Sequence, residues 1–232
     1  MAHTLTHGQG CRSRVVPQLA RAGWCAIILV GLGLLPIGEA RAQGHSHEAL
    51  IPVLGTTMEK PSTGQVVYLV LSFEQRGDEG GLAVLFKSTP GRFSPMTQTA
   101  VQEAIYRTAH ALGVSPHAWT VMLSLPYPGV TIYGGSCAAM VALSVMVLAK
   151  GGDIPADRVI TGTVTPDGHI GAVGAVPLKL AAANEAHLRQ VLVPDEQDET
   201  EADWETPFLM QVSPVGSVAQ AYQTFTDLQS IR

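Results

Sequence analysis

The chain has 232 residues, of which 46% are hydrophobic, and it carries a formal net charge of −5. This length gives room for one domain with a buried core and a short extension. The acidic balance argues against nucleic acid and against an anionic membrane surface as partners, because both attract basic proteins.

Residues 1–42 have the layout of a signal peptide. Three arginines precede an apolar stretch over 24–37, and the small residues Ala40 and Ala42 follow it. We therefore expect cleavage between Ala42 and Gln43 and export of the remaining chain to the periplasm or the medium. The alternative is an uncleaved anchor, and only then would the chain be attached to a membrane. The apolar stretch is shorter than the roughly 20 residues of a membrane helix, which favours cleavage.

The region after the signal is expected to hold one domain, 61–232, preceded by a flexible segment, 43–60, with a first short strand. Of the three cysteines only Cys137 lies in this region, so no internal disulfide is expected. His45 and His47 lack the further clustered ligands that a metal ion requires. The sequence therefore predicts neither a metal site nor a cofactor.

Two β-rich runs, 65–73 and 82–87, open the expected domain. The segment between them, 74–81, contains Gly-Asp-Glu-Gly-Gly, which is typical of a hairpin loop. We therefore expect the two runs to form an antiparallel pair.

Two long helices are predicted. Helical spacing of apolar residues indicates one over 94–112, with Ser94 as N-cap and Gly113 after its end. The other, 136–149, is apolar nearly all round, which is typical of a helix buried on most sides. The other expected elements are strands at 118–125, 158–164, 190–193 and 208–212, loops at 126–135 and 195–205, a turn at 165–168, a short helix from 177 and a helix at 215–228. Such an order predicts an α+β, or loosely α/β, fold with a mixed sheet and packed helices.

A glycine-rich turn carries the first candidate catalytic residue, Ser136. Gly134 and Gly135 leave the backbone open to a substrate carbonyl, and the first amides of a helix suit an oxyanion. The nucleophile and the oxyanion donors would then share one helix start. The alternative is that Ser136 is an ordinary N-cap.

Lys179 is the candidate base, because a neutral amine can take the proton of a serine hydroxyl where no histidine is available. A neutral lysine near pH 7 needs a pKa far below its ordinary value. Apolar neighbours favour this, and so does Pro177 at the first helical position, because the dipole of the first turn opposes positive charge. Thr161, on the expected strand 158–164, has a stiff side chain whose hydroxyl can orient the amine. The alternative is a surface lysine whose stem covers apolar neighbours.

Two other nucleophile arrangements are weaker. His169 and Asp167 could complete a Ser-His-Asp triad, but both lie in one tight turn, where neighbours seldom form the linear relay of a triad. Cys137 could replace Ser136 as the nucleophile, but no histidine lies beside it in the sequence. A small buried thiol is its commoner state.

These segments together resemble the proteolytic domain of the Lon protease family. The resemblance rests on Gly-Gly-Ser-Cys-Ala around Ser136, Ile-Thr-Gly-Thr-Val around Thr161, residues 168–175, Leu-Lys-Leu-Ala-Ala-Ala around Lys179, and Val-Leu-Val-Pro at 191–194. Lon domains have a serine, a Thr-Gly strand and a lysine before Leu-Ala-Ala in the same order, with a spacing close to the 43 residues found here. The resemblance is strong over 134–194, includes the helix 94–112 and is weak upstream of Pro90.

Several positions near the serine and the lysine differ from the family pattern. Lon domains have an acidic residue three before the serine and a glutamate before the lysine, where this chain has Tyr133 and Leu178. Gly135 and Cys137 replace a proline and an alanine beside the serine, and Thr163 replaces a glutamate. A nearby carboxylate would hold the amine as ammonium, so its loss makes the lysine easier to neutralise. The same losses are compatible with altered specificity or lost activity.

The resemblance implies a fold like the second domain of ribosomal protein S5 and a Ser136–Lys179 dyad, supported by Thr161 and by backbone amides near Gly135. Lon-type enzymes are ATP-driven, but this chain has no Gly-x-x-x-x-Gly-Lys-Ser/Thr phosphate loop. The implied activity is therefore ATP-independent endoproteolysis of peptides or flexible segments in exported or envelope proteins. The alternative is a catalytically inactive Lon-like domain that acts in binding or assembly. A monomer and a homo-oligomer both stay open.

Overall fold

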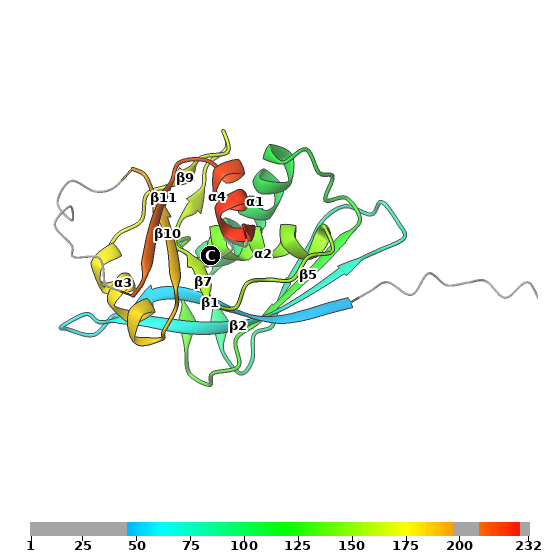
Figure 1. The fold of residues 1–232 in the computed structure, drawn as a ribbon. Helices are drawn as coiled ribbons and strands as arrows, with labels where there is room; N and C mark the ends of the chain where they lie inside the picture. The colour runs from blue at the N-terminus through cyan, green and yellow to red at the C-terminus, as the bar shows by residue number, and fades with distance from the viewer. Residues whose placement is uncertain (1–45, 197–208, 228–232) are drawn as a thin grey trace, which may run out of the picture. The chain divides into compact units, whose positions relative to one another are not determined.

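Two larger sheets, two short strand pairs and four helices form the part of the chain that the structure describes (Figure 1). This computed structural model describes residues 46–196 and 209–227. The expected signal, 1–42, and most of the acidic loop 195–205 lie outside the described residues. None of the described helices has the length and apolar character that a membrane span needs.

The first sheet begins with a long antiparallel pair. β1 (Ser46–Thr56) pairs with β2 (Gly64–Gln75) along its whole length, from Ser46 opposite Glu74 to Thr56 opposite Gly64. Residues 46–56, expected to belong to a flexible segment with a short strand, thus form an eleven-residue strand. The apolar run Ile-Pro-Val-Leu at its centre is buried and anchors it, while β2 pairs with the polar residues on both sides.

The sequence predicted a hairpin between the β-rich runs 65–73 and 82–87, and this prediction is wrong. β3 (Ala83–Phe86) pairs in parallel with β5 (Trp119–Ser124), and β2 pairs antiparallel with the other edge of β5. The sheet order is therefore β1-β2-β5-β3. Arg76 fastens the intervening loop, because its guanidinium donates to the Trp119 carbonyl at 3.2 Å and to Thr120 Oγ1 at 2.9 Å.

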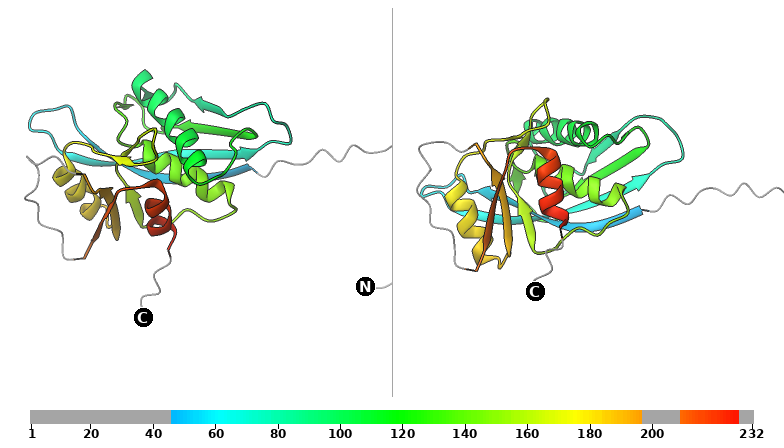
Figure 2. Two further views of the ribbon diagram at one scale, coloured as in Figure 1. Left: turned by 90° about the horizontal axis from the view of Figure 1, so that it is seen from above. Right: turned by 45° about the horizontal axis from the view of Figure 1, so that its top comes forward.

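Two helices pack against each other and build the core. α1 (Pro95–Ala111) has the predicted N-cap, since Ser94 Oγ accepts a hydrogen bond from the Thr97 amide at 3.2 Å. α2 (Ala138–Ala149) is buried at every position from Ala138 to Leu148, which confirms the helix expected from its all-round apolar surface. Figure 2 shows these two green helices side by side, and α2 also contacts β1 and β2.

The second sheet is parallel. Its strands are β7 (Arg158–Ile160), β10 (Gln190–Pro194) and β11 (Gln211–Val215), in the order β11-β10-β7. α3 (Val176–Glu185) lies between β7 and β10 in the sequence and packs against β2, and α4 (Val218–Thr226) packs on α2. A mixed, mainly antiparallel sheet and a parallel sheet with covering helices confirm the α+β class.

The strand expected over 158–164 is broken. β7 ends at Ile160, and β8 (Thr163–Val164) pairs with β9 (Ile170–Gly171) instead of continuing it. The intervening Gly162 has no space for a side chain, because an added Cβ would lie 2.6 Å from Ile170 Cγ2. A further short pair, β4 (Arg92–Phe93) with β6 (Thr131–Ile132), leads the chain toward α2.

Candidate active site

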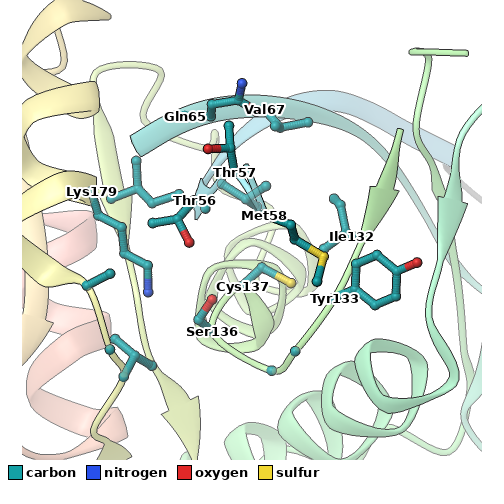
Figure 3. A pocket seen from close by; sticks show the side chains of 18 of the residues that line it. Thr56, Thr57, Met58, Gln65, Val67, Ile132, Tyr133, Ser136, Cys137 and Lys179 are labelled. Atoms are coloured by element: carbon teal, nitrogen blue, oxygen red, sulfur yellow. The ribbon is translucent and has the colours of Figure 1, made fainter. Parts of the chain in front are cut away.

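A cavity of about 890 Å³ lies where three separate segments of the chain meet. One wall is the end of β1 with the β1–β2 turn, a second is the segment that leads from β6 to α2, and a third is the segment before α3. Figure 3 shows this cavity with its side chains. Its lining includes Val53–Glu59, Gln65, Val67, 130–137, Thr163, 172–175 and Lys179.

Ser136 lies in the turn just before α2 and is half-buried. The N-cap of α2 is Cys137, which makes no side-chain capping bond, so the alternative that Ser136 is the cap is not what the structure shows. The Ser136 carbonyl accepts hydrogen bonds from the Gly162 amide at 2.9 Å and from Thr161 Oγ1 at 3.4 Å. On the other side, Thr97 Oγ1 donates to the Gly134 carbonyl at 2.9 Å. The serine is thus fixed between α1 and the break after β7.

The backbone amides around Ser136 differ in their hydrogen bonding. The first helical amides are used inside the protein, since Ala138 donates to the Gly135 carbonyl at 3.0 Å and Ala139 to the Gly162 carbonyl at 3.1 Å. The amides of Ser136 and Cys137 donate to no other described residue. These two amides belong to the region near Gly135 and Ser136 where the sequence predicts the oxyanion donors.

Lys179 projects into the same cavity from α3. The helix begins at Val176, so Pro177 is its second residue and not its first, and Lys179 is the fourth. The Lys179 amide still belongs to the first turn, because it donates to the Ala175 carbonyl at 3.1 Å. The residue is 4% exposed, so the surface-lysine alternative is wrong. In Figure 3 the amine extends from α3 toward the side of the cavity that carries Ser136.

Thr161 is buried, and its hydroxyl contacts the backbone of Ser136. It lies in the break between β7 and β8, its amide donates to the Leu192 carbonyl at 3.1 Å, and its hydroxyl donates to the Ser136 carbonyl. The sequence predicted that this hydroxyl orients Lys179, and this role stays a prediction. The hydrogen bond to the Ser136 carbonyl is a further contact that the sequence did not indicate.

Cys137 also lines the cavity, and its thiol is buried. Burial raises the pKa of this thiol to about 11, while a backbone hydrogen bond and the charge of Lys179 act in the opposite direction. A thiol with such a pKa is protonated near neutral pH and is a poor nucleophile. The cysteine alternative to Ser136 is therefore not supported.

The side chains of His169 and Asp167 contact each other, but they lie far from Ser136. His169 Nδ1 and Asp167 Oδ2 are 2.8 Å apart in the exposed β8–β9 turn. The Thr165 hydroxyl, and then the backbone amide and His169, hold the pKa of Asp167 below its ordinary value. Gly168 in this turn adjoins Ala111, whereas Gly135 beside the serine adjoins Ala100. These contacts are about 16 Å apart along α1, at 1.5 Å per residue, so a triad with Ser136 is excluded.

The β1–β2 turn is the part of the site that sequence reasoning missed. Thr56, Thr57, Met58 and Glu59 line the cavity, although they belong to the segment expected to be flexible. No motif marks them, and only the long pairing of β1 with β2 brings them there. Among the described residues, no group of three or more His, Cys, Asp or Glu side chains is placed to hold a metal ion.

Comparison with known families places the chain in a class and then in a family. The model of the Lon protease (S16) C-terminal proteolytic domain matches residues 97–218, which is more than half of the chain. By class, the matched region is thus a domain of a serine peptidase family. The chain belongs to the Lon protease family, and the matched region runs from the first turn of α1 to the start of α4 and includes Ser136 and Lys179. No curated protein matches the chain.

Proposed function

We propose that the chain is an ATP-independent serine endopeptidase in which Ser136 and Lys179 form the catalytic dyad. One observation carries the proposal: two side chains 43 residues apart line one cavity, and the lysine is buried there. A serine before a helix and a lysine in a helix have ordinary explanations when taken singly. Placed in one cavity, they supply the nucleophile and the base that acyl transfer needs.

In the proposed reaction, Ser136 Oγ attacks the scissile carbonyl carbon while the uncharged Lys179 Nζ takes the hydroxyl proton. Nζ then gives this proton to the leaving amine as the peptide C–N bond breaks, and an ester on Ser136 remains. A water molecule, deprotonated by the same amine, attacks the ester carbonyl. The C–Oγ bond then breaks, Nζ returns the proton to Ser136 Oγ, and the acid product is released. Each cycle consumes one water and one peptide bond. Because Lys179 is buried, little water remains to stabilise its ammonium form.

The backbone around the serine supports the same chemistry. The amides of Ser136 and Cys137 are the proposed donors to the oxyanion, since fixed donors aimed at developing charge are a large term in acyl transfer. Thr161 is proposed as a positioning residue, because its hydroxyl and the Gly162 amide both hold the Ser136 carbonyl. Gly135 also packs closely, since an added Cβ would lie 3.1 Å from Ala100 Cβ and 3.3 Å from Thr163 Cγ2, so a larger residue there requires these neighbours to shift slightly.

The substrate is proposed to bind in an extended conformation along the second edge of β2. β5 pairs with this edge only from Val70 to Gln75, and no described strand pairs with it from Gly64 to Leu69. A second cavity of about 610 Å³ lies beside this edge and shares Gln65, Val67 and Val130 with the cavity of Ser136. A free strand edge can hydrogen-bond an extended peptide, and the adjoining cavities give that peptide a route past the serine.

The proposal extends to the setting of the reaction. The signal-like residues 1–42 support export, and an exported protein does not meet cytosolic ATP. The substrates would therefore be peptides or flexible segments of exported or envelope proteins, which need no unfolding step. We also propose that the α+β domain has the fold of the second domain of ribosomal protein S5, as the family resemblance implies.

An activity-based probe tests the dyad. We expect a fluorophosphonate to label the folded protein at Ser136 without ATP, as mapped by peptide mass spectrometry. Ser136→Ala removes the attacked oxygen and Lys179→Met removes the base, so both variants should lose labelling. The exposed residues Lys87 and Ser88 provide matched controls, and Lys87→Met and Ser88→Ala should be labelled like the wild type.

The same experiment separates the peptidase from a catalytically inactive binding module. If the correctly folded wild type is not labelled at any pH between about 6 and about 10, a range that brackets the ionisation of a perturbed lysine, the peptidase proposal is wrong. The replacement of two acids by Tyr133 and Leu178 would then mark a Lon-like domain that has lost activity.

A further inference from the structure

The β1–β2 turn brings an apolar side chain, Met58, to the candidate active site. The base of this turn is held by four hydrogen bonds, one of which joins Thr57 Oγ1 and Thr63 Oγ1 at 3.3 Å. The Thr57 amide donates to the Thr63 carbonyl at 2.8 Å, Ser62 Oγ to the Thr57 carbonyl at 2.7 Å, and the Thr63 amide to Thr57 Oγ1 at 3.0 Å. The tip that carries Met58 is thus anchored to the end of the long β1–β2 pair.

Apolar side chains gather at the mouth of this cavity. Nine large hydrophobic side chains are exposed among the described residues, and three of them, Met58, Val130 and Tyr133, line it. Met58 is 85% exposed and Tyr133 is 62% exposed, although each belongs to a cavity wall. In Figure 3 the Met58 thioether extends toward the side that carries Ile132 and Tyr133. Apolar groups that meet at a concave surface mark a ligand site.

We propose that Met58 and Tyr133 form a clamp that selects a large apolar or aromatic substrate side chain close to the scissile bond. This inference rests on the proposed peptidase function and adds the residues that set its preference. A thioether packs favourably against aromatic rings, and the tyrosine ring offers a flat apolar face. Of the Asp, Glu, Lys and Arg side chains, Glu59 and Lys179 line the cavity. Neither Met58 nor Tyr133 offers an opposite charge to a charged substrate side chain, so any water that such a side chain loses between them is not replaced by an ion pair.

Cleavage kinetics give the first test. Peptide pairs that carry Phe or Ala at one position beside the scissile bond are compared by kcat/KM in the full chain. We expect the wild type to prefer Phe, and Met58→Ala and Tyr133→Ala each to reduce this preference by about tenfold, the usual scale for a few lost apolar groups. The change should fall on KM of the Phe peptide. Leu50→Ala is the matched control, because Leu50 is also an exposed apolar residue of β1 but does not line the cavity.

Binding gives a second test that needs no chemistry. In the Ser136→Ala chain, fluorescence anisotropy with the same labelled peptides should show tighter binding of the Phe peptide. Adding Met58→Ala or Tyr133→Ala should weaken that binding about tenfold and leave the Ala peptide unchanged. If both substitutions keep the Phe preference, the clamp is wrong, even where Ser136 is labelled normally. If Ser136 is not labelled but the Phe preference depends on both residues, the peptidase proposal fails and the clamp stands.

Discussion

Cys137 sits directly beside the proposed nucleophile, and burial sets its chemistry. The thiol has a pKa of about 11, against an ordinary value of 9.0. Its proton is therefore kept at the pH where a peptidase works, and a protonated thiol does not compete with Ser136 for the substrate carbonyl. Lys179, which lines the same cavity, is buried to a similar extent.

The thiol should react slowly in the native protein and lower the stability of the protein at alkaline pH. With Cys11 and Cys25 replaced by serine, we expect a disulfide reagent to modify Cys137 slowly near pH 8 and quickly in urea.

Between pH 9 and about 11 the native state holds the proton of the Cys137 thiol while the unfolded state releases it. The free energy of unfolding should therefore fall with rising pH in this window, by on the order of 3 kcal/mol in total. Urea titrations measure it, and Cys137→Ala should lack this part of the decline. Rapid native modification at pH 8 would contradict the buried state.

Local sequence predicted some site residues better than others. Apolar neighbours on both sides of Lys179 indicated burial, and the structure buries the side chain. The position of Ser136 before an apolar helix was also predicted, although the cap is Cys137. The hydrogen bond from Thr161 Oγ1 to the Ser136 carbonyl was not predicted. It depends on the break in the strand at Gly162, where the chain contacts α2 and β9.

At the scale of elements, the break at Gly162 connects three parts of the fold. The Gly162 amide holds the Ser136 carbonyl, and the Gly162 carbonyl accepts from the Ala139 amide at the start of α2. The same glycine lies beside Ile170 of β9, since a Cβ added to it would be 2.6 Å from Ile170 Cγ2. A change at this residue therefore reaches the nucleophile, the helix and the short β8–β9 pair together.

Gly162→Ala should lower both stability and activity. The new methyl group would lie 2.6 Å from Ile170 Cγ2, so the backbone or β9 must move. We expect a loss of about 1 to 3 kcal/mol in the free energy of unfolding, the usual range for overpacking, and weaker labelling of Ser136. Adding Ile170→Ala makes room and should restore part of the labelling. Gly77→Ala is the control, since an added Cβ there meets nothing within 4 Å. A Gly162→Ala protein that is as stable and as reactive as the wild type would show that the break tolerates a side chain.

Helices and strands differed in how far they could be predicted. α1 and α2 were expected close to their actual bounds, because helical periodicity and capping are local properties. The pairing of β3 was predicted wrongly, because a loop rich in glycine is compatible with a hairpin and with a crossover. The choice depends on β5, more than thirty residues further along the chain, which takes the place between β2 and β3.

At the scale of the whole molecule, the proposed peptidase depends on export. Removing residues 1–42 takes away four arginines and one glutamate and leaves a net charge of −8. The exported chain would then have one thiol and no disulfide, so packing of its core must hold it together.

Processing of the N-terminus can be measured directly. We expect the chain, expressed from Met1 in a bacterial host, to appear in the periplasm or the medium with Gln43 as its first residue, as shown by intact mass and peptide mapping. A signal peptidase needs small residues before the cut, so replacing Ala40 and Ala42 with large residues should leave the precursor uncleaved. Recovery of the wild-type precursor in the membrane fraction would support the anchor alternative.

The sequence by itself determined the residue types, their order and the apolar helix that follows the serine, because these depend on local patterns and on spacing. The family resemblance followed from the same motifs, and the match over residues 97–218 agrees with it. Only the tertiary structure decided that Ser136 and Lys179 line one cavity and that the β1–β2 turn adds Met58 to its wall. Contacts between residues far apart in the sequence depend on how distant segments pack around a shared core, and no local pattern in the chain encodes them.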